Sequence, residues 1–122
     1  AGMLGGALLA WGGFALPMVE PMIAVSVLLI GVLAASAARP SAIVGSAVLF
    51  AFALFHGFAH GTELPQTAQP ALYVLGFLLT SALVQLAAVR LAIGLRSGRL
   101  SAVVRIAGGA VAAVGGGWLV GG

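Results

Sequence analysis

The sequence predicts an all-α integral membrane protein, a bundle of about five transmembrane helices that forms one domain over residues 1–122. Three observations predict this class. Apolar residues make up 62% of the chain and charged residues only 6%, against about a quarter in a soluble domain. The apolar residues form continuous runs, whereas a membrane β-barrel alternates apolar and polar residues. Prolines and polar residues separate runs that approach the roughly 20 residues needed to span a bilayer.

The composition also excludes several classes of protein. Water cannot solvate a surface with so few charges, so a soluble monomer is excluded. The chain has no Cys, which excludes a disulfide scaffold and any cysteine chemistry. A P-loop, a Rossmann fingerprint and a zinc-finger pattern are absent. The basic residues do not form an accessible cluster, so the expected surrounding is the lipid bilayer and no nucleic-acid partner is expected.

Five apolar runs are predicted to cross the membrane. The first stops at Pro17, the second at Arg39 and Pro40, and the third before the polar loop 62–70, while the loop 96–99 precedes the fifth. Prolines lie at boundaries, where a missing N–H does least harm. The expected spans are about 1–16, 22–38, 41–61, 71–95 and 101–122. The first run begins abruptly without a basic segment, so it does not read as a signal peptide, and we expect an N-terminal span of a longer parent to be missing.

The charged residues predict the orientation of these spans. Arg39 lies between the second and third spans, and the other four arginines lie around the loop between the fourth and fifth. Glu20 and Glu63 lie in the two remaining loops, which hold no basic residue. Because basic loops stay in the cytoplasm, the Glu loops are predicted to face outward and the C-terminus to lie outside.

The last span carries small residues at intervals of four, Gly108, Ala112 and Gly116. Small residues let membrane helices approach closely, so this ridge predicts tight helix packing. Its partner is either another helix of the same chain or a second copy in a homo-oligomer, and the sequence leaves both open.

Ionisable residues in the third span form the candidate site, because such residues are costly inside a membrane. His56 and His60 are four residues apart and therefore share one helical face, and Glu63 falls within the same arc if the helix continues that far. Two imidazoles and a carboxylate suit a borderline divalent ion such as nickel, cobalt, zinc or copper. At about 1.5 Å per residue, His56 lies in the outer half of the membrane. The predicted metal ligands are His56, His60 and Glu63.

Further polar residues are expected at similar depths, where they would line a path or vestibule open to the outer face. These residues are Glu20, Ser26, Tyr73 and Thr80. Each has a structural interpretation as well. Hydroxyl groups readily bond to their own helix backbone, Glu20 can be a solvated loop charge, and a histidine pair can be a hydrogen-bond network between helices.

At residues 55–63 the chain resembles the HupE/UreJ family of small bacterial nickel/cobalt permeases. That family carries a Phe-His-Gly-x-Ala-His-Gly-x-Glu segment, matched here by Phe55, His56, Gly57, Ala59, His60, Gly61 and Glu63. Weaker similarities lie at residues 16–20, 23–28 and 73–80. The chain departs from the family pattern at Phe58 and Gln85, where histidines are common, and it lacks the His-Pro…Asp-His motif of the family's first span.

The resemblance implies an inner-membrane permease that moves nickel or cobalt inward from the outer face, with the metal as transported ion and no permanently bound cofactor. It does not imply an enzyme. Two alternatives remain open. The first is a non-transporting membrane subunit or assembly partner of a larger complex, in which the histidine pair is structural; the three departures from the family pattern favour it. The second is an intramembrane metal-dependent hydrolase, for which no third-ligand-plus-base pattern is visible.

Overall fold

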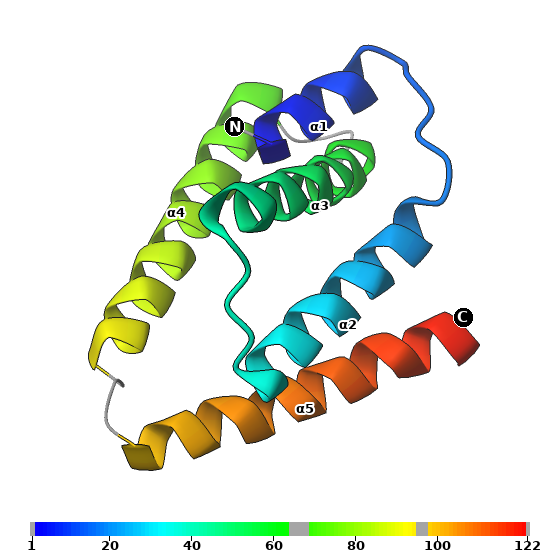
Figure 1. Ribbon diagram of the computed structural model, residues 1–122. Coiled ribbons are helices and arrows are strands. Elements are labelled where there is room, and N and C mark those ends of the chain that lie inside the picture. The colour runs from blue at the N-terminus through cyan, green and yellow to red at the C-terminus, as the bar shows by residue number, and fades with distance from the viewer. Residues whose placement is uncertain (1, 64–68, 95–97, 122) are drawn as a thin grey trace.

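The computed structural model describes residues 2–63, 69–94 and 98–121. Over these residues the chain forms five helices, α1 (Gly2–Trp11), α2 (Val19–Ser36), α3 (Ala42–Thr62), α4 (Pro70–Gly94) and α5 (Gly98–Gly121) (Figure 1). Helices α2 to α5 each contain a stretch long and apolar enough to cross a membrane, which confirms the predicted all-α membrane class. Their bounds lie within three residues of the predicted spans. Parts of the two predicted polar loops, residues 64–68 and 95–97, lie outside the described residues.

Within the described part of the first predicted span, residues 2–16, only α1 is helical, and it ends five residues before the expected boundary. A glycine pair ends the helix. Gly13 adopts a φ of 76°, a left-handed conformation that glycine tolerates, and its N–H donates to Ala10 O while the N–H of Phe14 donates to Leu9 O. The ten residues of α1 rise about 15 Å, half of the roughly 30 Å bilayer core.

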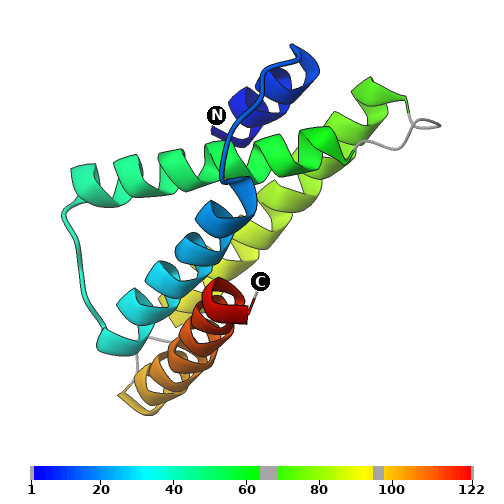
Figure 2. The ribbon, with the colours of Figure 1, turned by 90° about the vertical axis from the view of Figure 1, so that its right-hand side faces the viewer.

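The helices pack as two pairs, with α4 to one side (Figures 1 and 2). Helix α1 lies along α3 and runs in the same direction, whereas α2 lies along α5 and runs in the opposite direction. Few side chains are buried, and many large apolar side chains are open to the surroundings; Ile43 is 83% exposed and Val120 is 92% exposed. Such a surface is stable against lipid and not against water.

Glycines allow α1 and α3 to touch along their backbones. A Cβ atom on Gly57 would collide with the backbone of Met3, and one on Gly6 would collide with the backbone of Leu54. The glycines buried in this contact are Gly2, Gly6, Gly57 and Gly61. The contact therefore fixes how α3 is rotated about its own axis, and this rotation decides where the side chains of the neighbouring residues point.

The small-residue ridge of α5 faces α2 of the same chain. A Cβ on Gly31 of α2 would collide with the backbone of Ala112, and Gly108 is buried in the same contact. The third close approach is made by Gly115, where the sequence pattern had placed Gly116. A Cβ on Gly116 would meet only a leucine side chain, at an ordinary 3.8 Å. An α-helix turns every 3.6 residues, so a spacing of four and then three keeps a straight contact line better than two spacings of four.

Replacing Gly108 by Leu is expected to weaken the packing of α2 against α5. A Cβ there would lie 2.6 Å from Ala35 N, so the added side chain has no room beside the backbone of α2. Gly109→Leu is the matched control, because nothing lies within 4 Å of a Cβ at that position. We expect the thermal unfolding midpoint in detergent to fall by several degrees for Gly108→Leu only. Equal midpoints for the two variants would contradict this packing.

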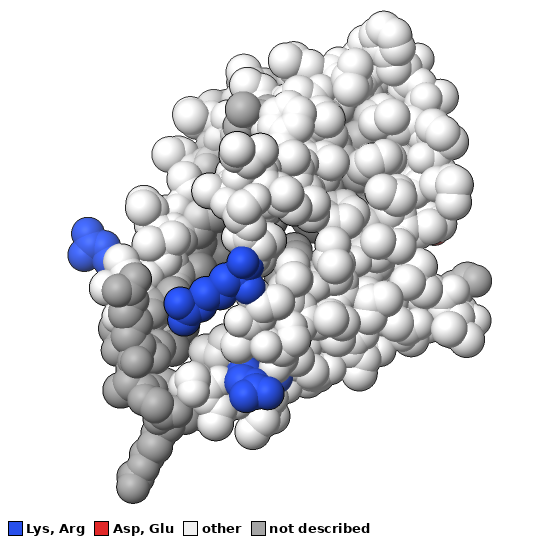
Figure 3. Space-filling view, in the orientation of Figure 1, with Lys and Arg blue, Asp and Glu red and all other residues white. Residues whose placement is uncertain are grey.

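The charged side chains are divided between the two ends of the bundle. Glu20 lies in the first turn of α2 and Glu63 follows the end of α3. The arginines whose side chains are described lie at the opposite end, namely Arg39, Arg90 and Arg105. Figure 3 shows basic side chains gathered over that end of one face. Arg105 Nε donates to Ala35 O at 2.8 Å, where the last turn of α2 leaves carbonyl groups without helical partners. The assignment of the basic end to the cytoplasm stays a prediction.

Candidate functional site

The two histidines lie one above the other on the last turns of α3. Their ring centroids are 5.3 Å apart, and the ring planes are tilted by 60°. This is the proximity expected for residues four apart on a helix. His56 is exposed and the side chain of His60 is 36% exposed, so neither imidazole is sealed inside packed protein.

The glycines beside the histidines determine the direction in which the two imidazoles point. Gly57 and Gly61 each follow a histidine by one residue, which is about 100° around the helix. Because both glycines are buried against α1, the two imidazoles are turned away from that contact. Trp11 adds a hydrogen bond at the same level, with its Nε1 donating to Gly61 O at 3.2 Å. The face of α3 that carries His56 and His60 is here called the histidine face. The contact with α1 therefore determines the direction in which the histidine face points.

Glu63 lies just beyond the end of α3. The last helical residue is Thr62, and the N–H of Glu63 still donates to Ala59 O at 3.1 Å. Its Oε2 lies 3.8 Å from Nδ1 of His60, and its side chain is 70% exposed. The helix thus stops one residue short of Glu63, yet the carboxylate remains beside the histidine face.

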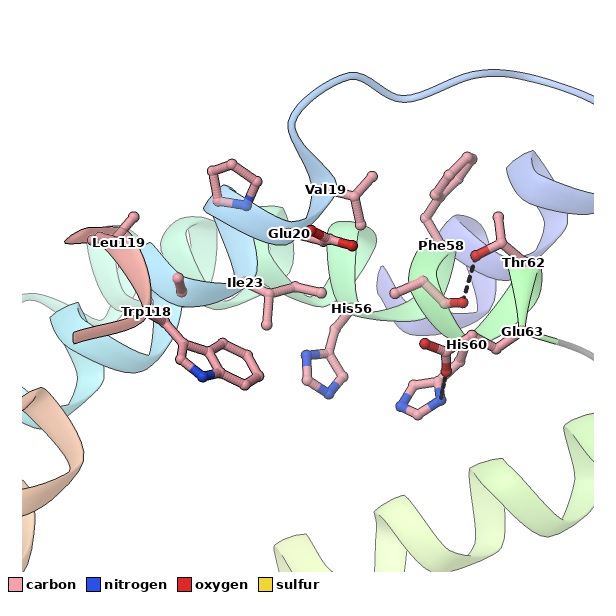
Figure 4. Close-up of a pocket in the computed structure, with 13 residues that line it drawn as sticks. Val19, Glu20, Ile23, His56, Phe58, His60, Thr62, Glu63, Trp118 and Leu119 are labelled. Atoms are coloured by element: carbon pink, nitrogen blue, oxygen red, sulfur yellow. Dashed lines mark hydrogen bonds and ion pairs between the residues drawn. The ribbon is translucent and has the colours of Figure 1, made fainter. Parts of the chain in front are cut away.

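A cavity of about 770 Å³ opens beside these side chains (Figure 4). Its walls come from the start of α2, the end of α3 and the end of α5. The titratable side chains that line it are two imidazoles and two carboxylates, namely Glu20, His56, His60 and Glu63. No arginine is among the described lining residues. The electrostatic character of this cavity therefore suits a cation.

The remaining predicted path residues lie elsewhere. Tyr73 on α4 is outside the cavity lining, and its hydroxyl donates to His60 O at 3.3 Å. Ser26 is buried and its Oγ donates to Ile23 O at 2.6 Å, which is a bond within its own helix. Thr80 is exposed on α4, a helix that contributes no wall to the cavity. Neither Ser26 nor Thr80 lines this cavity, because depth alone does not determine which face a side chain occupies, and their role in a path stays a prediction.

The predicted ligands do not converge as a set of three. Among the described residues, no three His, Asp or Glu side chains are grouped closely enough to hold one metal ion. With metal–nitrogen bonds of about 2.0 Å, two nitrogen ligands of a tetrahedral ion lie roughly 3.3 Å apart. The 5.3 Å between the ring centroids of His56 and His60 is compatible with two ring nitrogens at this spacing, one from each imidazole.

Two aromatic residues that sequence reasoning did not assign to the site lie near the histidines. Trp118 of α5 lines the cavity on the side of His56 (Figure 4). Phe77 of α4 places its ring centroid 4.7 Å from that of His60, with the planes tilted by 51°. Both aromatic residues come from other helices, so no local spacing pattern links them to the histidines.

Comparison with known proteins identifies a family. The model of the family described as "HupE / UreJ protein" matches residues 1–119. The chain is 43% identical over 120 residues to the protein HupE of Rhizobium leguminosarum bv. viciae. The match covers 98% of this chain and 62% of that relative, so the chain spans about three-fifths of the relative's length. These findings confirm the resemblance seen at residues 55–63. No solved structure matches the chain.

Proposed function

Because the chain belongs to the HupE/UreJ family, we propose that it is a permease that carries a divalent transition-metal ion, nickel or cobalt, across the bacterial inner membrane. The ion enters from the outer face, the side on which the C-terminus also lies, and reaches His56, His60 and Glu63. One observation carries the proposal: the cavity is lined by two imidazoles and two carboxylates, and no arginine is among its described lining residues. The metal is the transported substrate.

The residue types give each group a distinct role. Neutral imidazole nitrogen binds nickel and cobalt well, so His56 and His60 are the ligands. Glu63, at 3.8 Å from Nδ1 of His60, is placed to orient that ring and leave its other nitrogen free for the ion. Glu20 is exposed at the start of α2 and raises the local concentration of cations at the cavity. In this proposal the ion is first attracted by the Glu20 carboxylate and is then bound by His56 and His60.

Transport is tested by the entry of Ni²⁺ or Co²⁺ into proteoliposomes that contain the whole chain and a metal-sensitive dye. We expect saturable entry of these ions and none of Mg²⁺, which prefers oxygen ligands. The absence of saturable Ni²⁺ and Co²⁺ entry would contradict the permease proposal.

Glu20→Gln is expected to slow uptake several-fold at low metal concentration and low ionic strength. The substitution removes the charge but keeps the shape, and an exposed charge acts through a field that salt screens. The difference from wild type should therefore shrink as salt is added. Ser36→Ala, an exposed hydroxyl bonded within its own helix at the opposite end of α2, is the control. A loss of uptake that does not depend on salt would contradict the attracting role of Glu20.

Two observations favour a second candidate, a non-transporting membrane subunit. The described residues do not bring three ligand side chains together, and α4 exposes most of its surface. In such a subunit the histidine pair would stabilise helix contacts, and α4 would pack against another protein. A purified wild-type chain that binds neither Ni²⁺ nor Co²⁺ would support this candidate over the permease.

A further inference from the structure

Helix α4 meets the histidine face through two side chains. The Tyr73 hydroxyl donates to the main-chain oxygen of His60 at 3.3 Å. Phe77, about one turn further along α4, places its ring 4.7 Å from the imidazole of the same histidine. None of the described side chains of α4 is buried. Both of these contacts of α4 are therefore made with the same residue, His60.

The imidazole of His60 has a different neighbour on each side. His56 lies along α3 at 5.3 Å between ring centroids, the Glu63 carboxylate lies 3.8 Å from Nδ1, and Phe77 lies on the side of α4. In Figure 4 the His60 ring points from α3 toward the ribbon of α4. Phe77 is not among the residues that line the cavity. The His60 imidazole thus lies between the Phe77 ring on one side and the cavity on the other.

We propose that Phe77 is a positioning residue that holds the imidazole of His60 in the orientation needed to bind the transported ion. The inference rests on the proposed function, because it assigns the orientation of a metal ligand. Tilted aromatic pairs at this centroid distance attract each other. A side chain held in its binding orientation before the ligand arrives loses less conformational freedom on binding. Tyr73 supports the same arrangement by holding the backbone of His60.

The ring contact is tested by NMR on the whole chain in nanodiscs, with histidine and phenylalanine isotopically labelled. Wild type should show a cross-peak between the Phe77 ring and the His60 imidazole. Phe77→Leu should lose the ring-current shift of the His60 signals, whereas Phe77→Tyr, which keeps a ring, should retain it. Leu79→Ala, an exposed position on α4, is the matched control and should leave the His60 signals unchanged. Absence of the cross-peak in wild type overturns the proposal, even if Phe77→Leu does not fold.

The consequence for binding is tested by titrating the same samples with Ni²⁺ and Co²⁺. We expect the Kd of Phe77→Leu to rise about tenfold, the lower end of what outer partners of metal ligands contribute. Phe77→Tyr should restore a Kd close to that of wild type. Equal Kd values for wild type and Phe77→Leu would overturn the positioning role and leave the permease proposal standing. A wild-type chain that shows the cross-peak but binds neither ion would instead overturn the proposed function, and the positioning role with it.

Discussion

Removing both imidazoles, in the variant His56→Ala/His60→Ala, is expected to abolish the binding of Ni²⁺ and Co²⁺ by the purified chain. Each single substitution is expected to raise the Kd at least tenfold, which is about 1.4 kcal/mol of binding free energy. The chain has only two histidines and no cysteine, so no other nitrogen or sulfur side chain of comparable affinity can replace them. The carboxylates of Glu20 and Glu63 alone should bind these ions weakly.

The measurement is calorimetric titration of the metal-free chain in detergent, with helix content checked by circular dichroism. A matched double variant on the same helix is Ile43→Ala/Leu49→Ala, which truncates two side chains that are exposed and remote from the cavity. Its binding should equal that of wild type. If the double histidine variant binds metal as well as wild type does, His56 and His60 are not the ligands.

Gly57→Leu is expected to give the largest structural effect of any single substitution on α3. A Cβ at Gly57 would collide with the Cα, C and O atoms of Met3, and backbone cannot move aside as a flexible side chain can. Overpacking lowers the free energy of unfolding by about 1–3 kcal/mol and occasionally more, and a clash with backbone is expected at the upper end of this range. Because this contact also sets the rotation of α3, metal binding at His56 and His60 should fall together with stability.

Gly45→Leu on the same helix is the matched control. A Cβ there would meet only Pro40 Cγ, at 3.8 Å, so the new side chain has open space. Thermal unfolding in detergent and metal titration should therefore leave Gly45→Leu close to wild type. Equal losses in the two variants would show that glycine matters for α3 in general and not for its contact with α1.

Much of the fold could be predicted from the sequence, because the membrane imposes simple rules on length and polarity. The bounds of α2 to α5 follow from apolar run length and from residues such as Pro40 and Pro70. The end of α1 was placed too late. Pro17 is a strong helix breaker, but the left-handed conformation of Gly13 had already ended the helix. A glycine pair inside an apolar membrane run has two interpretations, close packing or termination, and the pattern alone does not separate them.

The site was predictable only within one helix. The proximity of His56 and His60 follows from helical geometry, which is the same whatever surrounds the helix. Depth in the membrane follows from the rise per residue, and it grouped Ser26 and Thr80 with the histidines. The direction in which those hydroxyls point depends on how each helix is rotated by its neighbours. The contact of Phe77 with His60 depends on the same packing, so spacing along the chain did not reveal it.

The one-residue offset between the histidines and the glycines of α3 has a consequence for protein engineering. Residues 56–61 contain two interleaved patterns, one that contacts α1 and one that faces the cavity. Copying the histidine spacing onto another helix would transfer the imidazoles without the contact that directs them. A single-residue insertion between Gly57 and His60 would change the spacing of both the histidines and the glycines. The smallest part of this site that could be transferred to another protein is therefore a helix pair, α3 together with α1. A transferred α3 without α1 should carry two imidazoles whose direction is not fixed by helix packing.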